Sequence, residues 1–292
     1  MLLFAGLTAA LAAACGDDAP AVDEVAETPT TTHGATPSSP SSPATEERST
    51  PWPVPIEDEI DGSWGIEILA EIPHDPTAFT QGLEVDRGRL LESTGRTGES
   101  TLREIDLADG EVLASVPLDA ELYGEGLTVL GDEVIQLTWR AGRALRWDRA
   151  SFAPLGEFTY DGEGWGLCAA GDELLMSDGS ATLTKRHGSD FAVIDTVEVR
   201  RAGEPVELLN ELECIDGLVL ANVWRSDEIM VIDPDSGRVR ATIDAAQLRA
   251  SVDTADPAET LNGIADLGDG TVLLGGKNWP RHFVVRLTAG GG

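Results

Sequence analysis

The chain has 292 residues, with 52 acidic side chains against 20 basic ones, and a formal net charge of −32. A surface of this charge repels nucleic acid and anionic lipid headgroups, which argues against both as partners. The 32 glycines favour a β protein that is rich in turns.

The N-terminal residues 1–15 resemble an export signal. The segment Met1–Ala14 is apolar, ends in small residues and is too short to span a bilayer. Cys15 follows directly, as in bacterial lipoprotein signals, where the cysteine becomes the lipidated N-terminus. We therefore expect an exported cell-envelope lipoprotein that meets the membrane only through its lipid. A secreted or periplasmic protein is the alternative.

Residues 16–62 are rich in Pro, Ser, Thr, Ala and acidic side chains and contain few large apolar ones. Such a segment buries too little surface to offset the entropy lost on ordering. We expect a disordered linker here and a single folded domain over residues 63–290.

One short pattern recurs in that domain at intervals of 44, 40, 46 and 51 residues. Its five copies are Gln81-Gly82-Leu83, Glu125-Gly126-Leu127, Trp165-Gly166-Leu167, Glu211-Leu212-Glu213 and Asn262-Gly263-Ile264. A Gly/Asp turn and a second apolar run follow each copy, which is the signal of a β-hairpin.

Third and fourth strands complete most units, so the repeat predicts a five-bladed β-propeller with four antiparallel strands per blade. The fifth unit ends after three strands, at Phe283–Leu287. The N-terminal strand Gly65–Ile72 is available as its fourth, and we expect it to close the last blade. A ring closed in this way needs no partner, so we expect a monomer.

The first strands of such a ring line its axis, where the first residues of the five copies would meet. Gln, Glu, Trp, Glu and Asn are not interchangeable, which favours a binding site over a merely wet channel. The ends of the second strands add Trp139, Trp224 and Lys277. Tryptophans around a carboxylate are typical of a pocket for an apolar or cationic group.

Burial among indoles raises the pKa of a carboxyl group towards neutrality, which suits a group that accepts and returns a proton. We choose Glu125 over Glu211 for this role, because Glu211 has Asn210 beside it and Glu213 two residues on.

At these residues the sequence resembles the plant- and bacterial-type glutaminyl-peptide cyclotransferases, also called glutamine cyclotransferases. The segments that carry the resemblance are His74–Leu83, Tyr123–Thr128, Leu137–Trp139, Glu163–Leu167, Ser177–Ser180, Leu209–Glu213, Ala221–Trp224, Leu261–Ala265 and Gly276–Pro280. The resemblance implies a five-bladed propeller, and an acyltransferase that converts the N-terminal glutamine of peptides or proteins to pyroglutamate and releases ammonia.

The resemblance makes Glu125 the proton-transfer residue and implies no cofactor. It assigns the rest of the pocket to Phe79, Gln81, Tyr123, Trp139, Trp165, Asn210, Trp224 and Lys277. The chemistry suits these residue types, because the α-amine attacks the side-chain amide within one residue. The protein then has to hold a conformer, move a proton and stabilise an oxyanion. Lys277 is a candidate for the last task.

Two other functions fit parts of the sequence. A metal-dependent hydrolase is disfavoured, because His74, His187 and His282 fall at unrelated repeat positions and show no paired spacing, so we expect no metal. A non-catalytic cell-surface propeller that binds a peptide or sugar in the Trp-lined axial pocket remains the alternative.

Cys168 and Cys214 lie on neighbouring inner strands of the predicted ring. In an oxidising compartment they would form either a disulfide or a pair of buried thiols.

Overall fold

The computed structural model describes residues 62–252 and 256–289. The expected signal segment 1–15, Cys15 and all but the last residue of the expected linker 16–62 lie outside the described residues. The expectations for them therefore stay predictions.

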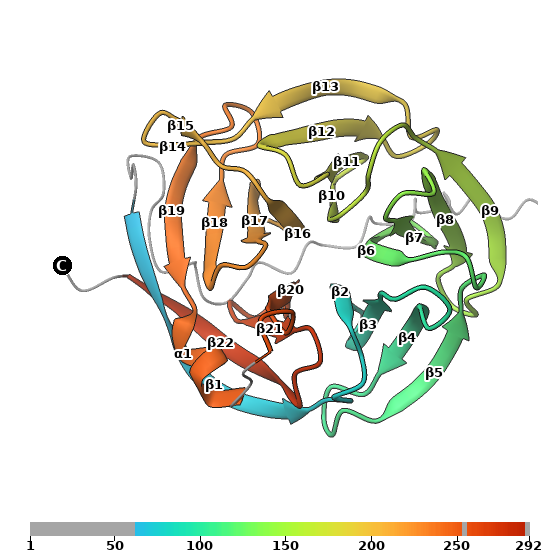
Figure 1. Ribbon diagram of the computed structural model, residues 1–292, viewed down its shortest axis with the longest axis horizontal. Coiled ribbons are helices and arrows are strands. Elements are labelled where there is room, and N and C mark those ends of the chain that lie inside the picture. Colours follow the sequence, from blue (N-terminus) through green and yellow to red (C-terminus); the bar gives the residue numbers. More distant parts are fainter. Residues whose placement is uncertain (1–61, 253–255, 290–292) are drawn as a thin grey trace, which may run out of the picture. The chain divides into compact units, whose positions relative to one another are not determined.

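Four main β-sheets surround a central axis (Figure 1). Three of them have four antiparallel strands in chain order. The first is β2 (Thr80–Asp86), β3 (Arg89–Thr94), β4 (Thr101–Ile105) and β5 (Val112–Pro117). The second is β6 (Gly124–Leu130), β7 (Glu133–Thr138), β8 (Arg143–Asp148) and β9 (Pro154–Thr159). The third is β10 (Leu167–Ala170), β11 (Glu173–Met176), β12 (Thr182–His187) and β13 (Val193–Glu198).

The fourth sheet has eight strands in the order β16-β17-β18-β19-β1-β22-β21-β20. Its strands are β1 (Gly62–Pro73), β16 (Leu209–Ile215), β17 (Leu218–Val223), β18 (Glu228–Ile232), β19 (Val239–Asp244), β20 (Leu261–Asp266), β21 (Val272–Gly276) and β22 (Arg281–Ala289). A two-stranded sheet, β14 (Arg200–Arg201) with β15 (Glu204–Pro205), and the helix α1 (Ala246–Val252) complete the described elements.

The prediction of five separate four-stranded blades is wrong. Strand β1 pairs with β22 in antiparallel fashion and also with β19 in parallel fashion, where Gly62–Trp64 face Ala241–Ile243. These two pairings merge the fourth and fifth repeats into one sheet. The repeat pattern counts strands, but it carries no information on how the outer strands of neighbouring units pair.

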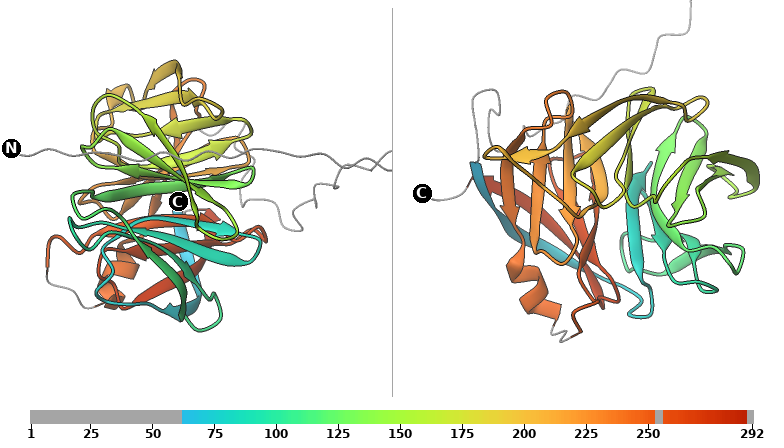
Figure 2. Two further views of the ribbon diagram at one scale, coloured as in Figure 1. Left: turned by 90° about the vertical axis from the view of Figure 1, so that its right-hand side faces the viewer. Right: turned by 45° about the horizontal axis from the view of Figure 1, so that its top comes forward.

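Hydrophobic side chains fill the spaces between neighbouring sheets. Leu91 of β3 and Leu127 of β6, for example, belong to one buried cluster that joins the first two sheets. Helix α1 lies at the periphery in the side views of Figure 2, with Leu248 and Val252 buried against the eight-stranded sheet. No helix within the described ranges has the length and apolar character needed to cross a membrane.

The inner strands approach one another so closely that the middle residue of the repeated pattern is glycine in four of the five copies. A Cβ on Gly126 would lie 2.7 Å from the Trp165 carbonyl oxygen, and one on Gly166 would lie 2.1 Å from the Asn210 carbonyl oxygen. The amide of Gly126 also donates a hydrogen bond to that Trp165 oxygen, at 2.7 Å. The glycines therefore bring the residues before them together at the axis.

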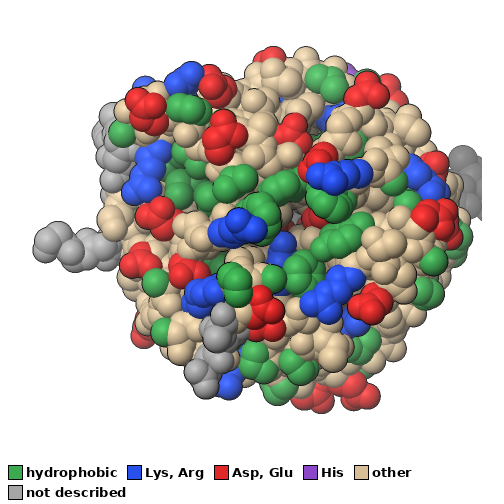
Figure 3. All heavy atoms as spheres, viewed as in Figure 1, with side chains coloured by type: hydrophobic (Ala, Val, Ile, Leu, Met, Phe, Trp, Pro, Cys, Tyr) green, Lys and Arg blue, Asp and Glu red, His purple; other side chains and the backbone are tan. Residues whose placement is uncertain are grey.

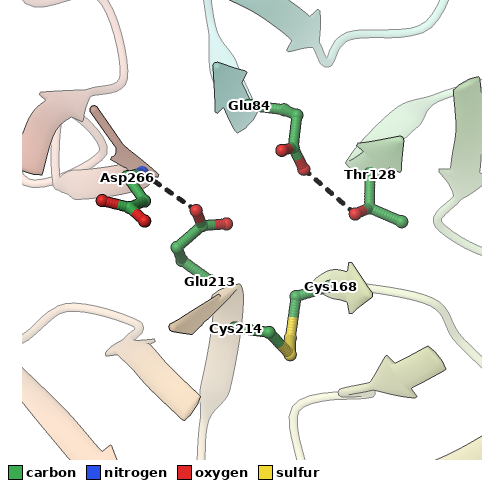
Figure 4. The surroundings of a disulfide bond; sticks show 6 residues. All are labelled: Glu84, Thr128, Cys168, Glu213, Cys214 and Asp266. Carbon is green, nitrogen blue, oxygen red and sulfur yellow. Dashed lines mark hydrogen bonds between the residues drawn. A yellow bond between two sulfur atoms is a disulfide. The ribbon is translucent and has the colours of Figure 1, made fainter. Parts of the chain in front are cut away.

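A disulfide joins Cys168 of β10 to Cys214 of β16, with their Cα atoms 5.4 Å apart (Figure 4). The alternative of two thiols is thereby excluded for this structure. Around the bond, Glu84 accepts a hydrogen bond from the Thr128 hydroxyl, and Glu213 accepts one from the Asp266 backbone amide.

Candidate active site

A cavity of about 310 Å³ opens at the axis. It is lined by all nine residues that the sequence placed in the pocket, together with Arg225, Pro257 and Ala258. The nine are Phe79, Gln81, Tyr123, Glu125, Trp139, Trp165, Asn210, Trp224 and Lys277. Figure 3 shows hydrophobic side chains gathered around a central hollow, with Lys and Arg side chains among them.

The inner strands aim residues into this cavity through β-bulges. The pairing of inner and second strands shifts register in four units, between Thr80 and Gly82, Gly124 and Leu127, Leu209 and Leu212, and Leu261 and Ile264. Bulges of this kind redirect a side chain and are frequent beside active sites.

Strand pairing also corrects the alignment of the fourth copy by one residue. Leu209 pairs with Val223 and Leu212 with Ala221, as Gly124 and Leu127 pair with their partners in the second unit. Asn210 is therefore the equivalent of Glu125, and Glu211 occupies the glycine position. The carboxylate of Glu211 accepts the backbone amides of Leu83 and Ile264, at 3.3 and 2.9 Å, and is not part of the cavity lining.

The second strand of a unit contributes to the cavity the residue that directly follows its last paired residue. The backbone amides of Trp139, Trp224 and Lys277 donate to the carbonyls of Tyr123, Leu208 and Thr260 respectively. Gly95 occupies this position in the first unit and donates to Phe79. A Cβ on Gly95 would lie 2.5 Å from the Tyr123 ring, so glycine leaves the space that this ring fills.

A single carboxylate fixes two of the indole walls. Glu163 Oε2 accepts the indole N–H of Trp139 at 2.7 Å and that of Trp165 at 3.0 Å. Trp165 in turn meets Trp224 edge-to-face, with ring centroids 5.7 Å apart. The wall is therefore rigid before any ligand enters.

Glu125 and Lys277 are the buried carboxyl and amino groups of the cavity lining. Burial raises the pKa of Glu125 well above 4.5, and the charge of Lys277 partly offsets this rise. Burial lowers the pKa of Lys277 to about 8, against the opposing effect of Glu125. The ammonium lies 5.1 Å from the centroid of the Phe79 ring. Lys277 can therefore change protonation state near pH 8, and Glu125 holds its proton to a higher pH than an exposed glutamate does.

The polar side chains of the cavity are partly pre-arranged. Asn262 Nδ2 donates to Gln81 Oε1 at 3.2 Å, and Gln81 Nε2 donates to the Tyr123 hydroxyl at 3.3 Å. Asn210 Oδ1 is buried and has no hydrogen-bond partner in the described part of the chain. An unpaired buried acceptor in a cavity lining is available to a ligand N–H.

Two histidines that occupy unrelated positions of the repeat meet in the structure. The rings of His74 and His282 lie 4.0 Å apart between centroids and are tilted by 37°, and His74 Nε2 lies 3.0 Å from Glu92 Oε1. Ligand atoms of these three residues lie within 4.8 Å of one another, so they could hold a metal ion. None of them lines the cavity, and they lie at its outside, where His74 Nδ1 is 2.7 Å from the Trp279 carbonyl oxygen.

Sequence reasoning missed several residues of the site. The position of Glu163, two residues before Trp165, was a usable signal for a carboxylate near the indoles. Asn262 was recognised as a repeat residue but not as the group that holds Gln81. Pro257 and Ala258 lie between α1 and β20, outside the repeat, and carried no signal.

An apolar cavity with one buried acid, one buried lysine and several amide groups defines an enzyme of acid–base chemistry on a small polar group. The comparisons identify which enzyme family this is. A family model described as glutamine cyclotransferase matches residues 42–287. The chain belongs to the glutamine cyclotransferase family, and the resemblance stated from the sequence is confirmed.

Two known proteins show how close the similarity is. The chain is 37% identical over 227 residues to the glutaminyl-peptide cyclotransferase of Arabidopsis thaliana, covering 76% of this chain and 71% of that protein. It is also similar to the crystal structure of Myxococcus xanthus glutaminyl cyclase, with 38% identity and a TM-score of 0.76. That match covers 79% of this chain and 100% of the Myxococcus chain.

Proposed function

We propose that this chain is a glutaminyl-peptide cyclotransferase, which converts the N-terminal glutamine of peptides or proteins to pyroglutamate and releases ammonia. Family membership supports this activity, and so does the presence in one cavity of the buried acid Glu125 and the unpaired acceptor Asn210 Oδ1. The non-catalytic alternative is disfavoured, since it gives no reason for a carboxyl group with a raised pKa beside a lysine whose pKa is lowered.

In the proposed reaction, the neutral α-amine attacks the side-chain amide carbon of the same glutamine. Glu125 accepts a proton from the attacking amine and delivers it to the amide nitrogen. The bond between the amide carbon and that nitrogen then breaks, and ammonia leaves. Because burial raises its pKa above that of an exposed glutamate, Glu125 is a stronger base for the amine proton than an exposed carboxylate would be.

Other pocket residues hold the substrate for ring closure. Asn210 Oδ1 is positioned to accept an N–H of the substrate, and Gln81 to bond the first peptide group, with its orientation fixed by Asn262. The ammonium of Lys277 stabilises the negative charge that develops on the amide oxygen. The indoles confine the side chain and exclude water, which favours the closing conformer.

The decisive experiment incubates the purified protein with a peptide that begins with glutamine and follows its mass and the ammonia released. We expect loss of one ammonia per peptide and no reaction of the matched peptide that begins with asparagine. No turnover of any glutamine peptide would exclude the function.

We further propose that the protein is exported as a monomer and held at the cell envelope by a lipid on Cys15. The Cys168–Cys214 disulfide supports an oxidising compartment. Labelling of cells with radioactive palmitate tests the anchor. We expect label in the wild type and none in Cys15→Ala, and an unlabelled wild type would exclude lipidation. Light scattering of the purified protein tests the oligomeric state.

A further inference from the structure

Three repeat units carry an arginine at one and the same position, next to the cavity. Arg96, Arg140 and Arg225 directly follow Gly95, Trp139 and Trp224, the residues that end the second strands. All three side chains are exposed. We call them the arginine rim.

Each rim guanidinium stacks on an aromatic ring of the cavity. The Cζ atom of Arg96 lies 4.7 Å from the Phe79 centroid. That of Arg140 lies 3.8 Å from Trp139, and that of Arg225 lies 4.2 Å from Trp224. Stacking holds the plane of a guanidinium against the ring and leaves its N–H edges free to bind a carboxylate.

Two rim arginines have an uncommon backbone conformation. Their φ angles are 91° at Arg96 and 67° at Arg225, in the left-handed region that favours glycine or asparagine. The equivalent position of the last unit does carry such a residue, Asn278 (φ 58°). Unfavourable conformations of this kind concentrate at ligand-binding sites, where the side chain is needed.

The rim arginines also differ from most other arginines of the protein in their ion pairing. Most other arginines of the described residues pair with carboxylates, as Arg281 does with Glu71 and Arg286 with Glu67, although Arg186 and Arg249 bind backbone carbonyls instead. Across residues 62–252 and 256–289, Arg96 and Arg225 have no carboxylate partner, and Arg96 donates to Asn278 Oδ1 instead. Arg140 pairs with Glu163.

Two acidic groups near the rim already accept hydrogen bonds within the protein. The carboxylate of Glu163 accepts two indole N–H groups as well as the Arg140 Nε–H. Asp256, next to the lining residues Pro257 and Ala258, accepts the backbone amide of Ala258 at 2.8 Å. The carboxylates of Glu163 and Asp256 therefore already hold partners within the protein.

We propose that the arginine rim binds acidic side chains in the first few residues after the N-terminal glutamine, so that the enzyme prefers substrates with an acidic N-terminal segment. The inference rests on the proposed function. A cavity of about 310 Å³ holds little more than the first residue, so the rest of a peptide must cross the rim.

The overall charge predicts the opposite preference. A net charge of −32 repels an acidic peptide at long range. The sign of the preference therefore separates local recognition by the rim from the general field of the protein.

The test compares kcat/KM for the peptides Gln-Ala-Asp-Asp-Ala-amide and Gln-Ala-Asn-Asn-Ala-amide, which match in shape and differ in charge. We expect the full-length protein to favour the Asp peptide by about tenfold at low ionic strength, and the ratio to fall as salt is added. The triple variant Arg96→Gln/Arg140→Gln/Arg225→Gln should bring the ratio to one or below. The control variant Arg281→Gln/Arg286→Gln, which changes two ion-paired arginines of β22, should keep the wild-type ratio.

A wild-type ratio of one or less, or an unchanged ratio in the triple variant, would overturn the rim proposal while cyclotransferase activity stands. Absence of ammonia release from both peptides would instead overturn the proposed function. Since the readout is a ratio within each variant, a general loss of activity in the triple variant does not obscure it.

Discussion

The side-chain amide of Asn262 donates a hydrogen bond to Gln81 Oε1, so the last repeat fixes the orientation of a pocket residue of the first. Replacing Asn262 with alanine frees Gln81 to rotate. Because misplaced substrate contacts are costly in a ring closure, we expect kcat/KM to fall by about tenfold or more. The control is Asn222→Ala, which removes a buried acceptor of the Gly263 amide that does not contact Gln81. It should lower the melting temperature but keep kcat/KM within about threefold of the wild type.

Glu125 and Glu211 should differ in their roles, the first in catalysis and the second in the stability of the fold. Glu125→Gln is expected to lower kcat by about 10²–10⁴-fold and to leave the melting temperature nearly unchanged, because the group moves a proton. Glu211→Gln should instead destabilise the protein by about 1–3 kcal/mol, since an amide nitrogen cannot accept the backbone amides that Glu211 binds. Steady-state kinetics and thermal melts of both variants decide this. Equal kcat in Glu125→Gln and the wild type would remove Glu125 from the mechanism.

Lys277 should set the alkaline limb of the pH profile. Burial lowers its pKa to about 8, so the ammonium is lost as the pH rises through that value. The α-amine of a substrate must be neutral and has an ordinary pKa of about 7.7–8.0, so activity rises towards the same pH from below. We therefore expect a plot of kcat/KM against pH to be bell-shaped and narrow, with its maximum near pH 8. Lys277→Gln should lower kcat by about 10²-fold and abolish the descending limb. A descending limb that survives in this variant would assign it to another group.

The sequence allowed a better prediction of the site residues than of the way the sheets pair, and the reasons are physical. The residues before close-packed glycines must face the axis, which is why Gln81, Glu125 and Trp165 could be placed from spacing alone. The same rule failed at Glu211, because a carboxylate takes the glycine position there. Pairing of β1 with β19 depends on three residues, Gly62–Trp64, that have no counterpart in the repeat. The meeting of His74 with His282 likewise depends on how the two ends of the domain come together.

Ionisation of Glu84 should make the folded protein less stable as the pH rises. Burial raises the pKa of this carboxyl group from 4.5 to about 7, and the acids Asp86 and Asp266 act in the same direction. Between these pH values the folded protein binds more protons than the unfolded chain, so ionisation favours unfolding as the pH rises. We expect the melting temperature of the wild type to drop by a few degrees between about pH 5 and pH 8. Glu84→Gln should show a shallower drop. Melting temperatures that fall equally with pH in the wild type and in Glu84→Gln would exclude a contribution from Glu84.

The disulfide between β10 and β16 spans 46 residues of sequence. Closing a loop of this length restricts the unfolded chain, so its loss should cost about 2–4 kcal/mol. We expect Cys168→Ser/Cys214→Ser to melt about 5–15 °C below the wild type. A reducing agent should lower the melting temperature of the wild type but not that of the variant. If the wild type has the same melting temperature as the variant and reductant does not change it, the disulfide contributes nothing to stability.

The double pairing of β1 has a consequence for the order of events in biosynthesis. The first strand of the domain needs the last one, β22, as its antiparallel partner. A chain synthesised from its N-terminus therefore carries β1 without that partner until all the intervening strands and β22 itself have been made. Contacts between residues this far apart in sequence form slowly, and an apolar strand with a free edge can meanwhile pair with another chain. Synthesis and folding are thus separated in time for this protein, and an aggregation-prone interval lies between them.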